Sequence, residues 1–157
     1  MKLAIISDTH GNYPLAIRAI EAREGFDHII HLGDNIDDAW VVEDAIGQEI
    51  IKVPGNCDFV STLPRELTQD FAGKLLFVSH GDRYRVKEGL ARLVKKAAST
   101  TADIVLFGHT HAPLVEEINN TLFINPGSLA QNCPVPSFAI LSIVKGVASA
   151  EIITLDH

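Results

Sequence analysis

The sequence is poor in several features that define common protein classes. It has only two cysteines, Cys57 and Cys133, among 157 residues, which is too few for a disulfide-stapled secreted fold. No apolar run approaches the roughly 20 residues that span a bilayer, and the apolar run after Lys2 is too short for a signal peptide. We therefore expect a cytoplasmic protein without membrane contact, in which both thiols are free.

Basic charge is also scarce. The chain has 13 Lys and Arg against 20 Asp and Glu, which gives a net charge of −7. The densest basic pair, Lys95-Lys96, falls in a predicted helix and is typical of a solvated face. We therefore expect no stable nucleic-acid binding. Linkers, repeats and low-complexity tracts are absent, and the length suits one compact domain, which we place at 1–157.

The sequence does contain a regular alternation of apolar runs and amphipathic segments. The early β-α-β alternation indicates an α/β fold with a largely parallel sheet, and the strand-only C-terminal half indicates an added sheet. Amphipathic segments predict helices at Pro14–Arg23, Ile36–Ile46 and Val86–Ala98. Short runs rich in Ile, Val and Phe predict strands at Leu3–Ser7, His28–Leu32, Glu49–Val53, Lys74–Ser79, Ile104–Phe107, Thr121–Ile124, Phe138–Val144 and Ala148–Thr154.

Local signals mark the ends of some of these elements. The first helix has Asn12 as a candidate N-cap, Pro14 in its first turn and Gly25 as a candidate end. Lys145-Gly146, between the last two strands, predicts a hairpin turn.

Polar residues follow five consecutive predicted strands. Ligands of open α/β sheets bind at the carboxyl ends of strands, so the five clusters should converge on one site. Residues i and i+2 of an extended segment point the same way, so we expect Asp8 and His10 to face the site together, and likewise His109 and His111. The clusters are Asp8-Thr9-His10, Gly33-Asp34-Asn35, Gly55-Asn56-Cys57-Asp58, His80-Gly81-Asp82 and Gly108-His109-Thr110-His111.

The donors in these clusters are too many for one transition metal with an open position. If Asp34 bridges through its two oxygens, the set supplies four bonds to each of two metals, which lie roughly 3.5–4 Å apart in such centres. Mixed nitrogen and oxygen donors without thiolate suit two divalent transition-metal ions, with manganese expected first and nickel, cobalt, iron or zinc as alternatives. The candidate ligands are Asp8, His10, Asp34, Asn56, His80, His109 and His111.

In this order, the blocks D-x-H, G-D, G-N-C-D, H and G-H-x-H resemble the calcineurin-like metallophosphoesterase superfamily. The short length, the GNCD variant and the NPGS segment at Asn125–Ser128 are similar to its small, YfcE-like phosphodiesterase branch. The resemblance implies a four-layer αββα sandwich of two mixed β-sheets flanked by helices. We also expect a sharp turn at Asn125–Ser128 that supports the site through backbone groups.

The resemblance further implies roles for single residues. It places Asp8, His10, Asp34 and His111 on one metal, and Asp34, Asn56, His80 and His109 on the other. We expect Asp34, Asn56 and His80 to act most directly in catalysis. Larger members carry a leaving-group His where this chain has Cys57, which is either a weak proton donor or filler. Asp82 stands where members of the small branch often have a second His.

Several other residues have two readings. Asp58 either orients its neighbours or caps a turn. Asn12 either caps the first helix or contacts phosphate. Arg83, with Arg85, either binds a substrate anion or lies in a solvated loop. His28 and His31 have no partner cluster, so we expect core or surface roles for both.

The resulting hypothesis is a dinuclear metal-dependent phosphoesterase for a small phosphoester. It would hydrolyse phosphodiester bonds by attack of a metal-bridging hydroxide. One alternative is a phosphomonoesterase or nucleotidase with the same metal site. Another is a protein-binding scaffold like the retromer subunit of the superfamily, although the complete ligand set argues against it. The late strands offer an edge for a homodimer.

Overall fold

Two five-stranded mixed sheets form the centre of the computed structural model, which describes residues 1–156. Sheet 1 has the order β10-β9-β1-β2-β3, with β1, β2 and β3 parallel. Sheet 2 has the order β4-β5-β6-β8-β7, with β5, β6 and β8 parallel. The strands are β1 (Lys2–Ile6), β2 (His28–His31), β3 (Ile50–Lys52), β4 (Glu66–Phe71), β5 (Lys74–Ser79), β6 (Ile104–Leu106), β7 (Leu114–Ile118), β8 (Thr121–Asn125), β9 (Ser137–Val144) and β10 (Val147–Thr154).

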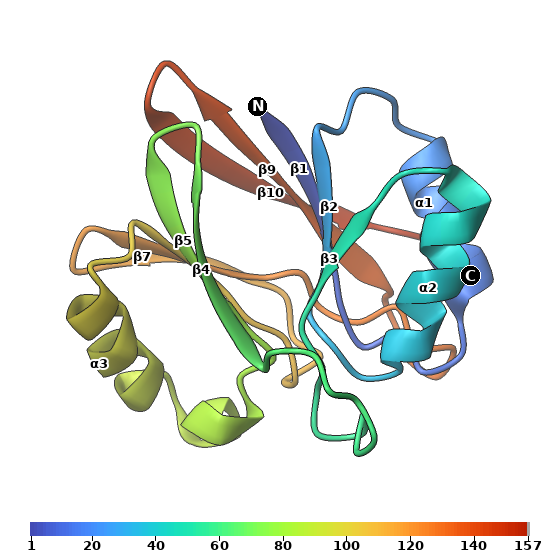
Figure 1. Cartoon of the computed structure of the whole chain (residues 1–157), viewed down its shortest axis with the longest axis horizontal. Helices are drawn as coiled ribbons and strands as arrows, with labels where there is room; N and C mark the ends of the chain where they lie inside the picture. Colours follow the sequence, from blue (N-terminus) through green and yellow to red (C-terminus); the bar gives the residue numbers. More distant parts are fainter. Residues whose placement is uncertain (157) are drawn as a thin grey trace.

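Helices cover the outer faces of both sheets. Helices α1 (Tyr13–Glu21) and α2 (Ile36–Ile46) lie beside sheet 1, and α3 (Ala91–Thr100) lies beside sheet 2 on the opposite side of the molecule (Figure 1). Two short 3₁₀ helices, η1 (Asp82–Tyr84) and η2 (Val86–Glu88), precede α3. This arrangement confirms the predicted four-layer αββα sandwich. Within residues 1–156, none of the helices has the length and apolar character needed to cross a bilayer.

The period-two alternation of the strands builds the layers. In β1, Leu3 and Ile5 face sheet 2 within the central core, whereas Ala4 and Ile6 pack against α1 and α2. A third apolar cluster joins Phe77 and Val105 of sheet 2 to Leu93 of α3. Because both faces of the central strands are buried, these strands are continuous apolar runs, which is why the sequence reveals them.

The predicted origin of the second sheet was wrong. Strands β9 and β10 return to sheet 1, where β9 pairs antiparallel with β1. Sheet 2 is built from the middle of the chain, and its outer strands β4 and β7 were not predicted. Both outer strands carry polar residues, and apart from Phe71 their residues are exposed or half-buried, so they lack the apolar run that marks a buried strand.

Two helix predictions also need correction. The predicted helix Val86–Ala98 is divided, because Gly89 has a φ of 129° between η2 and α3. Helix α1 ends at Glu21, before Gly25, and Asn12 makes no side-chain cap although Pro14 occupies the first turn. The Lys145-Gly146 turn is confirmed: both residues have positive φ, as a two-residue hairpin turn of type I′ requires.

Candidate metal centre

The five predicted clusters meet at one edge shared by the two sheets. Three of them follow β1, β2 and β3 of sheet 1, and two follow β5 and β6 of sheet 2. Backbone hydrogen bonds join neighbouring loops, with Asp8 N donating to Gly33 O at 2.9 Å and Gly108 N donating to His80 O at 2.9 Å. The site is thus formed between two sheets, not at the edge of a single sheet.

The candidate ligand atoms form two groups. Asp8, His10 and His111 bring one atom each to within 4.8 Å of one another, and so do Asp34, His80 and His109. Asn56 joins the second group, because its Oδ1 lies 3.2 Å from His80 Nε2. All seven side chains named from the sequence therefore come together in one place.

Asp8 has one carboxylate oxygen that is well suited to a cation. Its Oδ2 accepts hydrogen bonds from Ser7 Oγ and from His109 N. Its Oδ1 is buried and has no hydrogen-bond partner within residues 1–156. His111 Nε2 approaches it to 3.1 Å without the alignment of a hydrogen bond. A buried orphan oxygen is costly, so this atom fits the role of a metal ligand.

Asp34 lies between the two groups. Its Oδ1 accepts a hydrogen bond from Cys57 N at 2.9 Å. Its Oδ2 lies 3.7 Å from His10 Nε2 and 3.5 Å from His80 Nε2. Burial acts to raise the pKa of Asp34, but the His80 imidazole outweighs it and holds the pKa well below its usual range. Asp34 Oδ2 thus faces a histidine of each group, while Oδ1 is engaged by the backbone of the third loop.

His80 is held in one orientation by the backbone. Its Nδ1 donates to Leu32 O at 2.7 Å, which leaves Nε2 directed at Asn56, Asp34 and His109. A carbonyl partner on the far nitrogen sets the tautomer of a ligand histidine. Burial acts to lower the pKa of His80, but the carboxylates of Asp34 and Asp8 outweigh it and raise the pKa.

The loops that carry the ligands are turns with unusual backbone angles. Five of the seven candidate ligands have positive φ, between 44° and 69°. Asp8 and His10, and likewise His109 and His111, reach the site as expected, but through left-handed turns and not through extended segments. Left-handed backbone at non-glycine residues costs about 1–3 kcal/mol each and clusters at functional sites. These residues are Asp8, His10, Asp34, His109 and His111.

Two glycines allow the loops to approach closely. Gly33 has a φ of 101°, and a Cβ there would collide with the backbone of Gly55. A Cβ on Gly55 would in turn collide with the Asp34 carboxylate. The two loops can pack only because both side chains are absent.

Asp58 organises the second and third loops. Its Oδ2 accepts from Asp34 N at 2.9 Å and from Gly55 N at 2.7 Å, and its Oδ1 accepts from Ile36 N at 2.8 Å. Of the two readings of Asp58, the structure supports the one in which it orients neighbours. The sequence did not indicate Arg65, which donates to Gly55 O and Asp58 O and so holds the same loop.

The NPGS segment supports the site, but mainly through side chains. Asn125 Nδ2 donates to Gly108 O at 3.0 Å and to Thr110 Oγ1 at 3.0 Å. Ser128 Oγ donates to Asp8 O at 2.9 Å. The sharp turn exists, with Gly127 at a φ of 85°.

The remaining residues with two possible roles in the sequence make contacts outside the two ligand groups. Asn12 donates to Leu129 O at 2.8 Å instead of capping α1. Arg83 is exposed on η1, and Arg85 pairs with Glu88 on the surface. His31 is fully buried, and His28 packs edge-on against Phe71, as their expected structural roles require.

Cys57 lies at the mouth of the centre. Both cysteines are free, as expected. The Cys57 sulfur lies within 4.8 Å of ligand atoms of His10 and Asp34. Burial and the Asp34 carboxylate raise the pKa of the Cys57 thiol to about 11, so the thiol is protonated at neutral pH.

Comparison with known proteins identifies the family. The model of the calcineurin-like phosphoesterase superfamily domain matches residues 1–146. The chain belongs to this superfamily. It is 32% identical over 152 residues to the probable metallophosphoesterase YsnB of Bacillus subtilis, covering 95% of this chain and 88% of that protein. It is 29% identical over 155 residues to the phosphodiesterase YfcE of Escherichia coli, covering 83% and 80%.

Solved structures share the fold of this superfamily member. A predicted phosphoesterase from Streptococcus pneumoniae superposes with a TM-score of 0.82 at 24% identity, over 98% of this chain and 88% of that one. Vps29 from Entamoeba histolytica in complex with Zn²⁺ superposes with a TM-score of 0.75 at 20% identity, over 98% and 99%. The family assignment and the named relatives make this chain a metal-dependent phosphoesterase.

Proposed function

We propose that the protein hydrolyses phosphodiesters at a centre of two divalent metal ions, held by the seven ligands described above. The single observation that carries the proposal is Asp34 Oδ2, which faces His10 of one group and His80 of the other. Phosphodiesterase activity in named relatives supports the choice of diester. Manganese remains the expected metal, with nickel, cobalt, iron or zinc as alternatives, because the donors are imidazoles, carboxylates and one amide.

In the proposed mechanism, the residues of the protein hold the metal ions and orient the ligand side chains. When bound, the ions would activate water and stabilise the charge that develops on the phosphoryl oxygens. Asp8 Oδ1 and Asp34 Oδ2 would hold cations because hydrogen bonds occupy the other oxygen of each carboxylate. Leu32 O fixes the His80 ring.

Protonation of the leaving group should differ between this chain, which has Cys57 after the ligand Asn56, and family members that have a histidine at that position. The Cys57 thiol is a weak hydrogen-bond donor, and its high pKa makes it a poor acid near neutrality. We therefore expect activated aryl diesters to be good substrates and diesters with strongly basic alkoxide leaving groups to be poor ones. A small phosphoester with an aryl substituent is the first substrate to test.

The test is hydrolysis of bis(p-nitrophenyl) phosphate by chelator-stripped protein after addition of Mn²⁺, Ni²⁺, Co²⁺, Zn²⁺ or Fe²⁺. Activity that returns with metal, together with about two metal ions per chain by elemental analysis, is the expected result. No turnover with any of the five metals would refute the proposal. A rate on p-nitrophenyl phosphate that exceeds the diester rate would favour the monoesterase alternative, and metal content below one ion per chain would favour the scaffold.

A further inference from the structure

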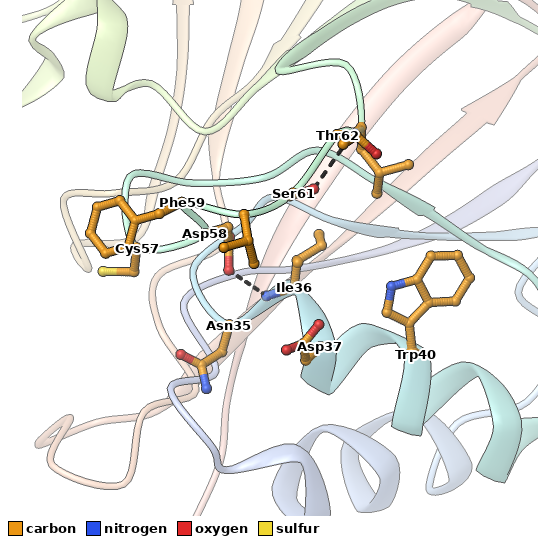
Figure 2. A pocket seen from close by; sticks show the side chains of 11 residues that line it. Asn35, Ile36, Asp37, Trp40, Cys57, Asp58, Phe59, Ser61 and Thr62 are labelled. Atoms are coloured by element: carbon orange, nitrogen blue, oxygen red, sulfur yellow. Dashed lines mark hydrogen bonds between the residues drawn. The ribbon is translucent and has the colours of Figure 1, made fainter.

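A groove leads away from the metal centre between the loop 57–63 and the first turns of α2. It encloses about 430 Å³, which is within the range of roughly 300–1,000 Å³ of small-molecule sites. In Figure 2, Cys57 and Phe59 stand at one end of the groove and Trp40 stands at the other, with Asp37 and Asn35 along the α2 side. The groove is therefore elongated and has an aromatic ring at each end.

The aromatic rings of the groove are unusually exposed. Phe59 is 85% exposed and Trp40 is 50% exposed. No core cluster among the described residues includes Phe59. Val60, which also lines the groove, is 95% exposed, and apolar residues exposed together around a hollow mark binding sites more often than single exposed residues do.

The charge of the groove limits the ligands that it can accept. None of its eleven lining residues is Lys or Arg, and two are Asp. The Asp58 carboxylate is occupied by backbone donors, whereas Asp37 is exposed in the first turn of α2. Lys52 Nζ lies over the Trp40 ring at 3.8 Å but pairs with Glu43. With Asp37 exposed, the groove therefore suits an uncharged group better than a second phosphate or a carboxylate.

The groove is continuous with the metal centre through Cys57. Cys57 lines the groove, its N–H donates to Asp34 Oδ1, and its sulfur lies within 4.8 Å of ligand atoms of His10 and Asp34. A group bound in the groove would therefore extend directly from a phosphorus atom held at the centre. A second hollow at the centre, lined by His10, His111, Gln131 and Asn132, leaves room for the second substituent of a diester.

We propose that this groove is the specificity site of the enzyme and binds an uncharged aromatic substituent of the phosphodiester, such as an aryl group or a nucleobase, against Phe59. The inference rests on the proposed phosphodiesterase function and names its substrate class. Stacking on an aromatic side chain is tolerant of the identity of the ring. The groove therefore selects for an aromatic and uncharged substituent and not for one particular compound.

Trp40 reports binding by fluorescence, separately from any rate measurement, because it is the single tryptophan of the chain. In Zn²⁺-loaded protein, diphenyl phosphate should produce a saturable change in Trp40 emission. Dimethyl phosphate, which has no ring, should bind with roughly five- to thirty-fold weaker affinity. Phe59→Ala should abolish this preference and Phe59→Tyr should retain it. Equal affinities for the two phosphates in the unmodified protein would overturn the inference.

Kinetics supply the second readout. Phe59→Ala should raise KM for bis(p-nitrophenyl) phosphate roughly five- to thirty-fold at unchanged metal content. Val147→Ala, an exposed apolar residue on β10, is the matched control and should leave KM unchanged. Asp37→Asn should improve turnover of a bis(carboxyphenyl) phosphate relative to the uncharged diester. An unaltered KM in Phe59→Ala would contradict the inference even if the enzyme is active. Absence of turnover in every variant, combined with a ring-dependent Trp40 signal, would refute only the phosphodiesterase function.

Discussion

The carboxylate of Asp58 accepts a hydrogen bond from the backbone N–H of Asp34 at 2.9 Å. Asp34 faces both groups of the centre, through His10 and His80. The same carboxylate also accepts from Gly55 N and Ile36 N. A buried side chain outside the set of candidate ligands thus sets the position of the residue that would bridge two metals.

Asp58→Asn should weaken metal binding, because an amide nitrogen cannot accept the N–H groups that Asp58 now binds. Loss of such an outer partner typically costs 10–100-fold in metal affinity, and an unpaired buried donor costs about 1–3 kcal/mol of stability. Titration calorimetry with Mn²⁺ and thermal unfolding measure the two effects. Asp44→Asn, on the exposed face of α2, is the control. A Kd within twofold of the original value would show that the loop holds its shape without Asp58.

Substitutions of the neighbouring residues Asn56 and Cys57 should have very different effects on activity. Asn56→Ala removes a candidate ligand and should lower kcat/KM for an aryl diester by about 100-fold or more. Cys57→Ala should change it by less than about threefold, since the thiol is a weak donor. Both variants need a metal analysis alongside the rate. If Cys57→Ala lost activity while its metal content stayed intact, the thiol would have to be a catalytic acid.

His31 should make the stability of the metal-free protein depend on pH. Burial lowers the pKa of His31 from 6.5 to about 4. Between these pH values the unfolded chain binds a proton that the folded protein excludes, so stability falls as the pH drops from about 6.5 to about 4. Integration over this window gives a loss of at most about 3 kcal/mol.

The measurement is urea unfolding at several pH values with chelator present, for the original chain and for His31→Gln. Gly33 N donates to His31 Nδ1, so Nε2 carries the proton and donates to Thr9 Oγ1. Gln retains one donor and one acceptor for these partners. The difference in stability between the two proteins should therefore shift steadily between pH 6.5 and 4. Parallel curves would mean that His31 does not titrate in this range.

Glu66 should stabilise the exposed strand β4. Its carboxylate accepts from Lys96 Nζ of α3 at 2.8 Å and from the Tyr84 hydroxyl of η1. Glu66→Gln should destabilise the protein by about 1 kcal/mol in urea unfolding at pH 7. The exposed pair Arg85–Glu88 provides the control, because Glu88→Gln should have little effect. Equal effects of the two substitutions would indicate that the contacts around Glu66 add nothing beyond a surface ion pair.

Much of the candidate site could be read from the sequence because its residues sit in short loops directly after buried strands. A strand buried on both faces is an apolar run, and the polar residue that follows it is conspicuous. Asp8, Asp34 and His80 were predicted for this reason, and the structure brings them together. The four-layer αββα fold followed from the resemblance of the five blocks to a known superfamily, and the alternation indicated its α/β class.

The tertiary structure decided what depends on contacts between distant segments. Strands β4 and β7 exist because they pair with the edges of a formed sheet, and their own residues are polar. Strand β9 joins β1 across most of the chain, a choice that no local pattern encodes. The left-handed turns of the ligand loops, the orphan oxygen of Asp8 and the backbone contacts of Asp58 likewise arise only when loops from separate strands are pressed together. The sequence by itself determined which chemical groups are available and where the buried strands end. Packing between the sheets decided how those groups face one another, because their orientation depends on contacts between residues far apart in the sequence.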